Sequence, residues 1–209
     1  MKNLRKRAAK LARKIARRQN WRQKARKLQK HIGKKVGKRL DGLIEALTKQ
    51  IKALHRDLID VEKQIEALQS REGRASYLKW LESTVGMTEG SAARIAEARD
   101  LGYDPSLPWC SIHVAYGLIH HGGFDRSELP ANPAYSGAWL TWSKGQRVSY
   151  ADAQPGDLLI FDWGDGGITD HVATFTGNGL KIGGNENNRV EKDAVPAGAI
   201  VAVIRPRWK

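Results

Sequence analysis

Apolar residues return every three or four positions between residues 40 and 68, which is the spacing of a coiled coil. Isoleucine and leucine at alternating core positions favour a parallel two-stranded assembly. We therefore predict a coiled coil over residues 40–70 and a parallel homodimer through residues 40–68, with a hairpin onto the preceding segment as the alternative. The core positions are Leu40, Ile44, Leu47, Ile51, Leu54, Leu58, Val61, Ile65 and Leu68.

The segment before this stripe, residues 1–39, carries the positive charge of the chain. It holds 18 of the 36 Lys and Arg residues and neither Asp nor Glu. The rest of the chain therefore contains the other 18 basic residues and all 22 acidic ones. A narrow apolar stripe that includes Leu11 and Ile15 predicts a cationic helical tail. Such a tail suits anionic envelope polymers or lipid, while nucleic acid binding and a merely solvated tail stay open.

Residues 71–209 show a different pattern, with helical spacing first and strand alternation afterwards. Gly73 is expected to end the coiled coil, and Ser91 is expected to cap a helix. The order of elements predicts an α+β domain with N-terminal helices and an antiparallel sheet. We expect helices at 77–85, 91–98 and 110–120, and strands at 158–161, 171–176, 180–182 and 200–204.

The helix expected after Pro108 places Cys110 in its first turn. Free N–H groups and the helix dipole favour a thiolate there, which is the nucleophilic form of cysteine. Cys110 is the one cysteine of the chain, so an internal disulfide is excluded. A buried cysteine that serves only as a small apolar residue is the alternative.

A nucleophilic cysteine needs a base, and His171 is the best-placed histidine. It opens a strand after a Gly-rich loop, whereas His113 follows Cys110 on the same helix and has poor geometry. A hairpin turn at residues 177–179 brings the neighbourhood of residue 171 opposite that of residue 185. We therefore expect Asn185 to orient the His171 ring, as the third member of a catalytic triad.

Between about residues 75 and 206, short segments of distinctive composition follow one another along the chain. They are Trp80 with Gly86, Pro108-Trp109-Cys110-Ser111 with Val114, Trp139-Leu140 with Trp142, Pro155-Gly156-Asp157-Leu158, His171-Val172, Ile182-Gly183-Gly184-Asn185-Glu186 with Val190, and Arg205-Pro206. In kind and in order these segments resemble those of the CHAP family, the cysteine- and histidine-dependent amidohydrolase/peptidases, which are papain-like. Residue 183 departs from the family pattern, because it is glycine where some relatives carry a glutamate.

The resemblance implies a peptidoglycan hydrolase of the phage endolysin type, acting on amide bonds of stem or cross-bridge peptides. In that role Cys110 attacks the amide, His171 moves the proton, and Asn185 holds the imidazole. Backbone N–H groups at the start of the helix, that of Cys110 included, stabilise the oxyanion. Glu186 is the weaker candidate for the orienting role. The substrate groove is expected to be walled by Trp109, Trp139 and Trp163.

No cofactor or metal is predicted. Asp100 and Asp104 are too few for a calcium loop, and Asp162, Asp165 and Asp170 are interpreted as loop residues. Without a recognisable signal peptide, we expect synthesis in the host cytoplasm and access to the wall by another route, or a place in the virion. The alternative function is a virion-associated or structural protein whose tail and rod bind nucleic acid or assemble.

Overall fold

The structure is a computed structural model that describes residues 2–29, 34–164 and 169–208. The chain divides into two compact units, Met1–Gln69 and Ser70–Lys209. Helix α1 spans Lys2–Gln29, and helix α2 spans Lys34–Ser83, so that its last turns belong to the second unit. Among the described residues, no helix is both long and apolar enough to cross a membrane.

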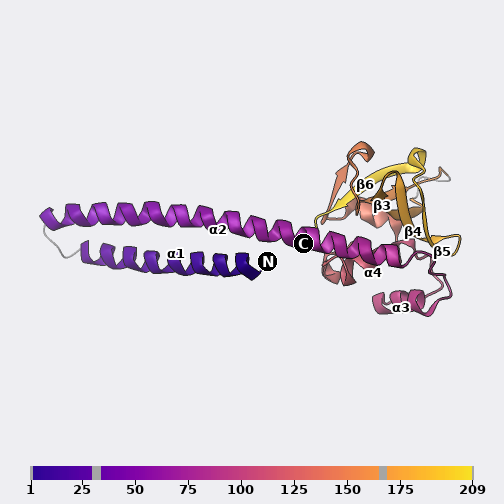
Figure 1. Ribbon diagram of the computed structural model, residues 1–209, viewed down its shortest axis with the longest axis horizontal. Coiled ribbons are helices and arrows are strands. Elements are labelled where there is room, and N and C mark those ends of the chain that lie inside the picture. Colours follow the sequence, from indigo (N-terminus) through magenta and orange to yellow (C-terminus); the bar gives the residue numbers. More distant parts are fainter. Residues whose placement is uncertain (1, 30–33, 165–168, 209) are drawn as a thin grey trace. The chain divides into compact units, whose positions relative to one another are not determined.

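The first unit is a helical hairpin, in which α1 runs back alongside α2 (Figure 1). Arg18 Nε on α1 donates a hydrogen bond of 2.9 Å to Gln50 Oε1 on α2. Leu11 and Ile15 of α1 are buried, as is Val61 of the heptad stripe. Ile51 is the other buried position of the stripe, and the remaining seven are half-buried, so the stripe is covered in part within one chain.

One prediction stays a prediction here and another is corrected. Within one chain α1 lies along α2, which is the alternative arrangement, and the parallel homodimer through residues 40–68 stays a prediction. Gly73 does not end the helix, since α2 continues to Ser83. One glycine costs a helix about 1 kcal/mol. Burial of Tyr77 and Leu81 further along α2 offsets that cost.

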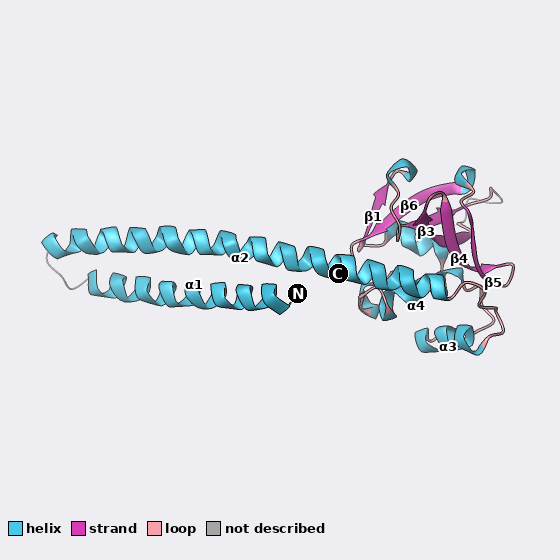
Figure 2. Cartoon of the chain, in the orientation of Figure 1, coloured by secondary structure: helices cyan, strands magenta, loops and turns pink. Residues whose placement is uncertain are grey.

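The second unit is α+β, as the order of patterns predicted, and its sheet is antiparallel throughout (Figure 2). Its strands lie in the order β1-β6-β2-β3-β4-β5. The α-helices are α3 (Ala92–Leu101) and α4 (Cys110–His120). The strands are β1 (Gly145–Val148), β2 (Leu158–Phe161), β3 (His171–Gly177), β4 (Leu180–Glu186), β5 (Arg189–Ala194) and β6 (Ile200–Pro206). Short 3-10 helices span Arg126–Glu128, Ser136–Thr141, Tyr150–Asp152 and Ala197–Ala199.

Helix α4 packs against strands β3 and β4, and this contact sets the position of its first residue. Ile112, Val114 and Leu118 of α4 are fully buried in the main core. Ser91 caps α3, as expected, by accepting the N–H of Arg94 at 3.3 Å. The start of α4 is therefore held by the sheet on one side and by the preceding helices on the other.

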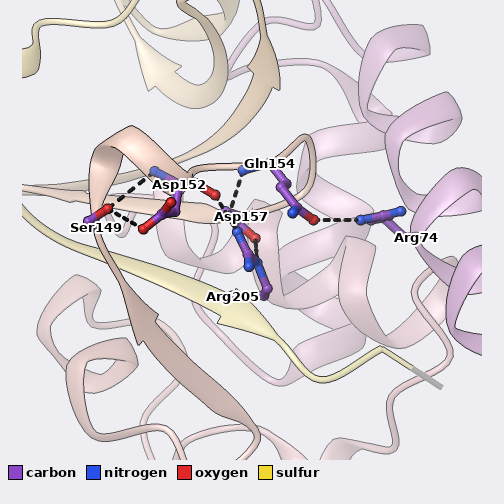
Figure 3. Close-up of polar contacts among 6 residues, drawn as sticks. All are labelled: Arg74, Ser149, Asp152, Gln154, Asp157 and Arg205. Carbon is purple, nitrogen blue, oxygen red and sulfur yellow. Dashed lines mark hydrogen bonds and ion pairs between the residues drawn. The ribbon is translucent and has the colours of Figure 1, made fainter.

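An ion pair between the buried Asp157 and the partly exposed Arg205 fixes the turn that leads into β2 (Figure 3). The Asp157 carboxylate accepts Arg205 Nε at 3.1 Å and Nη2 at 2.9 Å. It also accepts the backbone N–H of Gln154 at 2.8 Å, while Arg205 reaches the carbonyl of Asp152 at 2.6 Å. A bidentate Arg–carboxylate contact fixes the relative orientation of the two side chains as well as binding them strongly. The pair thus ties β6 to the start of β2, which lies next to the strand that carries His171.

Candidate active site

Cys110 is the first residue of α4, and its side chain is almost entirely buried at 6% exposure. Burial raises the pKa of the thiol. The hydrogen bond and charge of His171 and the backbone N–H groups of Val172 and Ser111 together lower the pKa by more than burial raises it. The pKa of Cys110 therefore lies below its ordinary value. The structure therefore places Cys110 in the first turn of a helix, where the sequence predicted it.

His171 is the first residue of β3, where it hydrogen-bonds the Cys110 thiol. Burial lowers the pKa of the imidazole, but the contacts with Cys110 and Glu186 prevail and raise it to about 9. A lowered thiol pKa beside a raised imidazole pKa favours the thiolate–imidazolium pair near neutrality. The structure thus brings the two predicted residues, 61 positions apart in the sequence, into direct contact.

The group that holds the His171 ring is Glu186 and not Asn185. His171 Nε2 donates to Glu186 Oε1 at 3.1 Å, which leaves Nδ1 as the ring nitrogen for the thiol. The other carboxylate oxygen, Oε2, accepts Lys181 Nζ. Burial raises the pKa of Glu186, and the hydrogen bonds and charges of His171 and Lys181 lower it to below its usual range. The third group is therefore a carboxylate that carries its charge.

The reason for this change of partner is an irregularity at the end of β4. The pairing of β4 with β5 shifts between Gly183 and Glu186, and Asn185 has a positive φ of 61°. Gly183 gives the Glu186 side chain its space, because a Cβ there would lie 2.1 Å from Glu186 Oε1 and 2.9 Å from His171 Nε2. In a regular strand the side chain of Asn185, and not that of Glu186, would lie on the same face of the sheet as His171. Counting along the hairpin assumed this regular alternation and therefore selected Asn185.

The three tryptophans expected in the substrate groove divide into two groups. Trp109 and Trp139 are fully buried, so they belong to the core and cannot wall an open groove. Trp139 Nε1 donates to Ser111 Oγ at 3.2 Å, which ties it to the helix of Cys110. Trp163 is 57% exposed and stacks on Phe161, at 5.7 Å between ring centroids. Trp163 alone of the three has the exposure that contact with a substrate needs.

Cys110 lies where two cavities meet. One, of about 300 Å³, is lined by Cys110 and His171 together with Pro108, Trp163, Asp170, Lys181, Asn185 and Glu186. The other, of about 510 Å³, shares Pro108, Cys110 and Asp170 with the first and extends past Tyr103 and Tyr135. Cavities of this size are typical of ligand sites. Cys110 therefore borders open space that belongs to both cavities.

The other candidate groups of the sequence are engaged elsewhere. His113 is buried and contacts Glu97 Oε2 at 2.9 Å through Nδ1, which fits its exclusion as the base. Asp162 and Asp170 accept backbone N–H groups of their own loop, and Asp165 lies outside the described residues. Carboxylate oxygens of Glu186, Glu191 and Asp193 gather within 4.8 Å of one another. Lys181, Glu191 and Asp193 were not predicted, because the pairing of β4 with β5 is what brings them to Glu186.

NlpC/P60 proteins are among the solved structures that the chain resembles. One is the NlpC/p60 domain of the peptidoglycan hydrolase SagA, with 30% identity, a TM-score of 0.35, and coverage of 55% of this chain and 97% of that one. Another is a lipoprotein-like NLP/P60 protein of Staphylococcus aureus, with 15% identity, a TM-score of 0.46, and coverage of 65% and 41%.

A third is an NlpC/P60 protein of Bacillus cereus, with 25% identity, a TM-score of 0.36, and coverage of 50% of this chain and 32% of that one. The chain thus spans less than half the length of the Staphylococcus aureus and Bacillus cereus proteins. No family model and no curated protein matches the sequence.

Proposed function

We propose that the chain is a peptidoglycan hydrolase that cleaves amide bonds of stem or cross-bridge peptides through a Cys110–His171–Glu186 arrangement. The observation that carries the proposal is the buried thiol that hydrogen-bonds an imidazole whose other nitrogen faces an ionised carboxylate. This is the nucleophile, base and orienter of thiol hydrolases. The resemblance to the CHAP family supplies the substrate class, and with it a phage-type lysin made in the host cytoplasm.

The reaction begins with attack of the Cys110 thiolate on the amide carbonyl carbon. The carbonyl oxygen gains the negative charge, which the N–H groups of the first turn of α4 stabilise. His171 then gives its proton to the leaving nitrogen as the C–N bond breaks, and a thioester remains on Cys110. In the second half His171 takes a proton from water, which attacks the thioester and restores the thiolate. Glu186 stabilises the imidazolium throughout.

The experiment that tests this proposal is digestion of purified peptidoglycan, with mass spectrometry of the released fragments. Cuts within the stem or cross-bridge peptides support an endopeptidase, whereas whole stem peptides released from intact muramic acid support an amidase. Undigested walls with folded protein at high enzyme concentration would contradict the substrate class. The products thus identify the bond, which the residues of the site leave open.

The pH dependence of activity follows from the two titrations. The active pair exists above the lowered pKa of Cys110 and below the raised pKa of His171, which is about 9. We expect kcat/KM to form a bell whose basic limb lies near pH 9 and whose acidic limb lies below the ordinary thiol value of about 8.5. A profile that rises through pH 8.5 without an earlier plateau would mean that the resting site is a neutral thiol.

We further propose that the helical hairpin binds anionic envelope polymers through the basic face of α1. Most Lys and Arg side chains of α1 are exposed, Lys6, Lys10 and Arg17 among them, and the helix contains no acidic residue. Because exposed charges are screened by salt, binding of the full chain to purified walls should fall steeply between low and physiological ionic strength. Unchanged binding across that range would contradict the proposal, and equal binding to DNA would favour the nucleic acid alternative.

A further inference from the structure

Lys181 lines the active-site cavity and has no part in the reaction scheme above. It lies on β4, its side chain is 5% exposed, and its Nζ donates to Glu186 Oε2. The opposite oxygen of the same carboxylate accepts His171 Nε2 at 3.1 Å. Glu186 is therefore held from both sides, by a buried cation and by the catalytic ring.

The surroundings of Glu186 would otherwise work against its charge. On β5, Glu191 and Asp193 bring their carboxylate oxygens within 4.8 Å of that of Glu186, and Asp193 is the register partner of Lys181. On β3 His171 faces Glu186, and from α4 the Cys110 thiol adds a second negative charge when it is ionised. The loop before β3 contributes Asp170 to the same cavity. Lys181 is thus the buried counter-charge to an otherwise acidic group of side chains.

We propose that Lys181 is a positioning residue that keeps the Glu186 carboxylate ionised and aligned on His171, so that the Cys110 thiolate persists at low pH. The inference uses the site of the proposed function but makes no use of its substrate. Burial raises the pKa of Glu186, and Lys181 is among the groups that oppose this effect. Without Lys181, the carboxylate takes up a proton more readily, and a neutral Glu186 stabilises the imidazolium less.

The test measures the rate at which iodoacetamide alkylates Cys110 in the full chain, as a function of pH. Because Cys110 is the chain's one cysteine, the rate reports this thiol alone. We expect Lys181→Met to lower the rate by about tenfold near pH 5, which is one pKa unit of the thiol. Lys181→Arg keeps the cation and should stay within about threefold of wild type. The matched control is Lys192→Met, an exposed lysine that pairs with Glu82 at 2.8 Å and should change nothing.

A second pair of variants separates positioning from a general effect on the fold. Lys181→Met alone leaves a buried carboxylate unpaired, whereas Lys181→Met with Glu186→Gln removes both charges together. If Lys181 acts through Glu186, the double variant and Glu186→Gln alone should agree within about twofold at every pH.

Two results would overturn the inference: a Lys181→Met profile that overlays wild type, or an equal tenfold loss when Lys181→Met is added to Glu186→Gln. If Lys181→Met does not fold, the comparison on the Glu186→Gln background decides the question. Since alkylation needs no peptidoglycan, a failure to digest walls would refute the substrate class and leave this test intact.

Discussion

Replacing Cys110 with alanine should reduce hydrolysis of peptidoglycan by about 10⁴-fold or more, because the attacking atom itself is removed. Cys110 is the single sulfur nucleophile of the chain, so no neighbouring thiol can substitute for it. His171→Ala should fall to a similar level, since the two residues act as a unit and their losses do not add. The measurement is the rate of fragment release from purified walls, with circular dichroism to verify the fold.

The matched control for this pair is His113→Gln, a second histidine on α4 that faces Glu97 and Thr84 instead of the cavity. It should retain activity wherever it folds. Wall hydrolysis that persists in folded Cys110→Ala would show that another group performs the reaction, and the mechanism would then be wrong.

Replacing Glu186 with glutamine should lower kcat/KM by about 100-fold and bring the basic limb of the pH profile down from about 9. Glutamine still accepts the His171 N–H but carries no charge, so the imidazolium loses its anionic partner. If the pKa of the His171 imidazolium falls by two units, the interaction weakens by about 100-fold, which is the expected loss in kcat/KM. The measurement is the pH profile of wall or fragment hydrolysis.

The comparison variant is Asn185→Gly, which removes the side chain first expected to orient the ring. Glycine is preferred to alanine because residue 185 has a φ of 61°, which glycine adopts without strain. Its activity should stay within about fivefold of wild type. Should Asn185→Gly lose more activity than Glu186→Gln, the orienting role would return to Asn185.

The contrast between these two residues shows how far the sequence could predict the site. The places of Cys110 and His171 in the fold were predicted from local signals, a helix start after Pro108 and a strand that opens on histidine. The third residue depended on counting along a hairpin, and a break in register at the end of β4 moved the answer by one position. A register shift is a property of two strands together, and the pattern of one strand does not contain it.

Two strands and the hairpin show the same limit. Strands β1 and β5 lie at the sheet edges and are largely polar and exposed, so they lack the apolar alternation by which β2 and β3 were predicted. The heptad pattern predicted an apolar stripe along α2, but the pattern does not specify which segment packs on that stripe. Trp109 and Trp139 were misplaced for a related reason, because a large aromatic beside a catalytic residue packs into the core as readily as it contacts substrate.

The central claim is that Cys110 rests as a thiolate stabilised by His171, and titration of the ultraviolet thiolate absorbance tests it most directly. With one cysteine in the chain, the difference between wild type and Cys110→Ala isolates this group. The account predicts a wild-type thiolate signal that persists below the ordinary pKa of about 8.5, and a shift of the signal to higher pH in His171→Ala. A wild-type signal that appears at or above pH 8.5 and is unchanged in His171→Ala would contradict it.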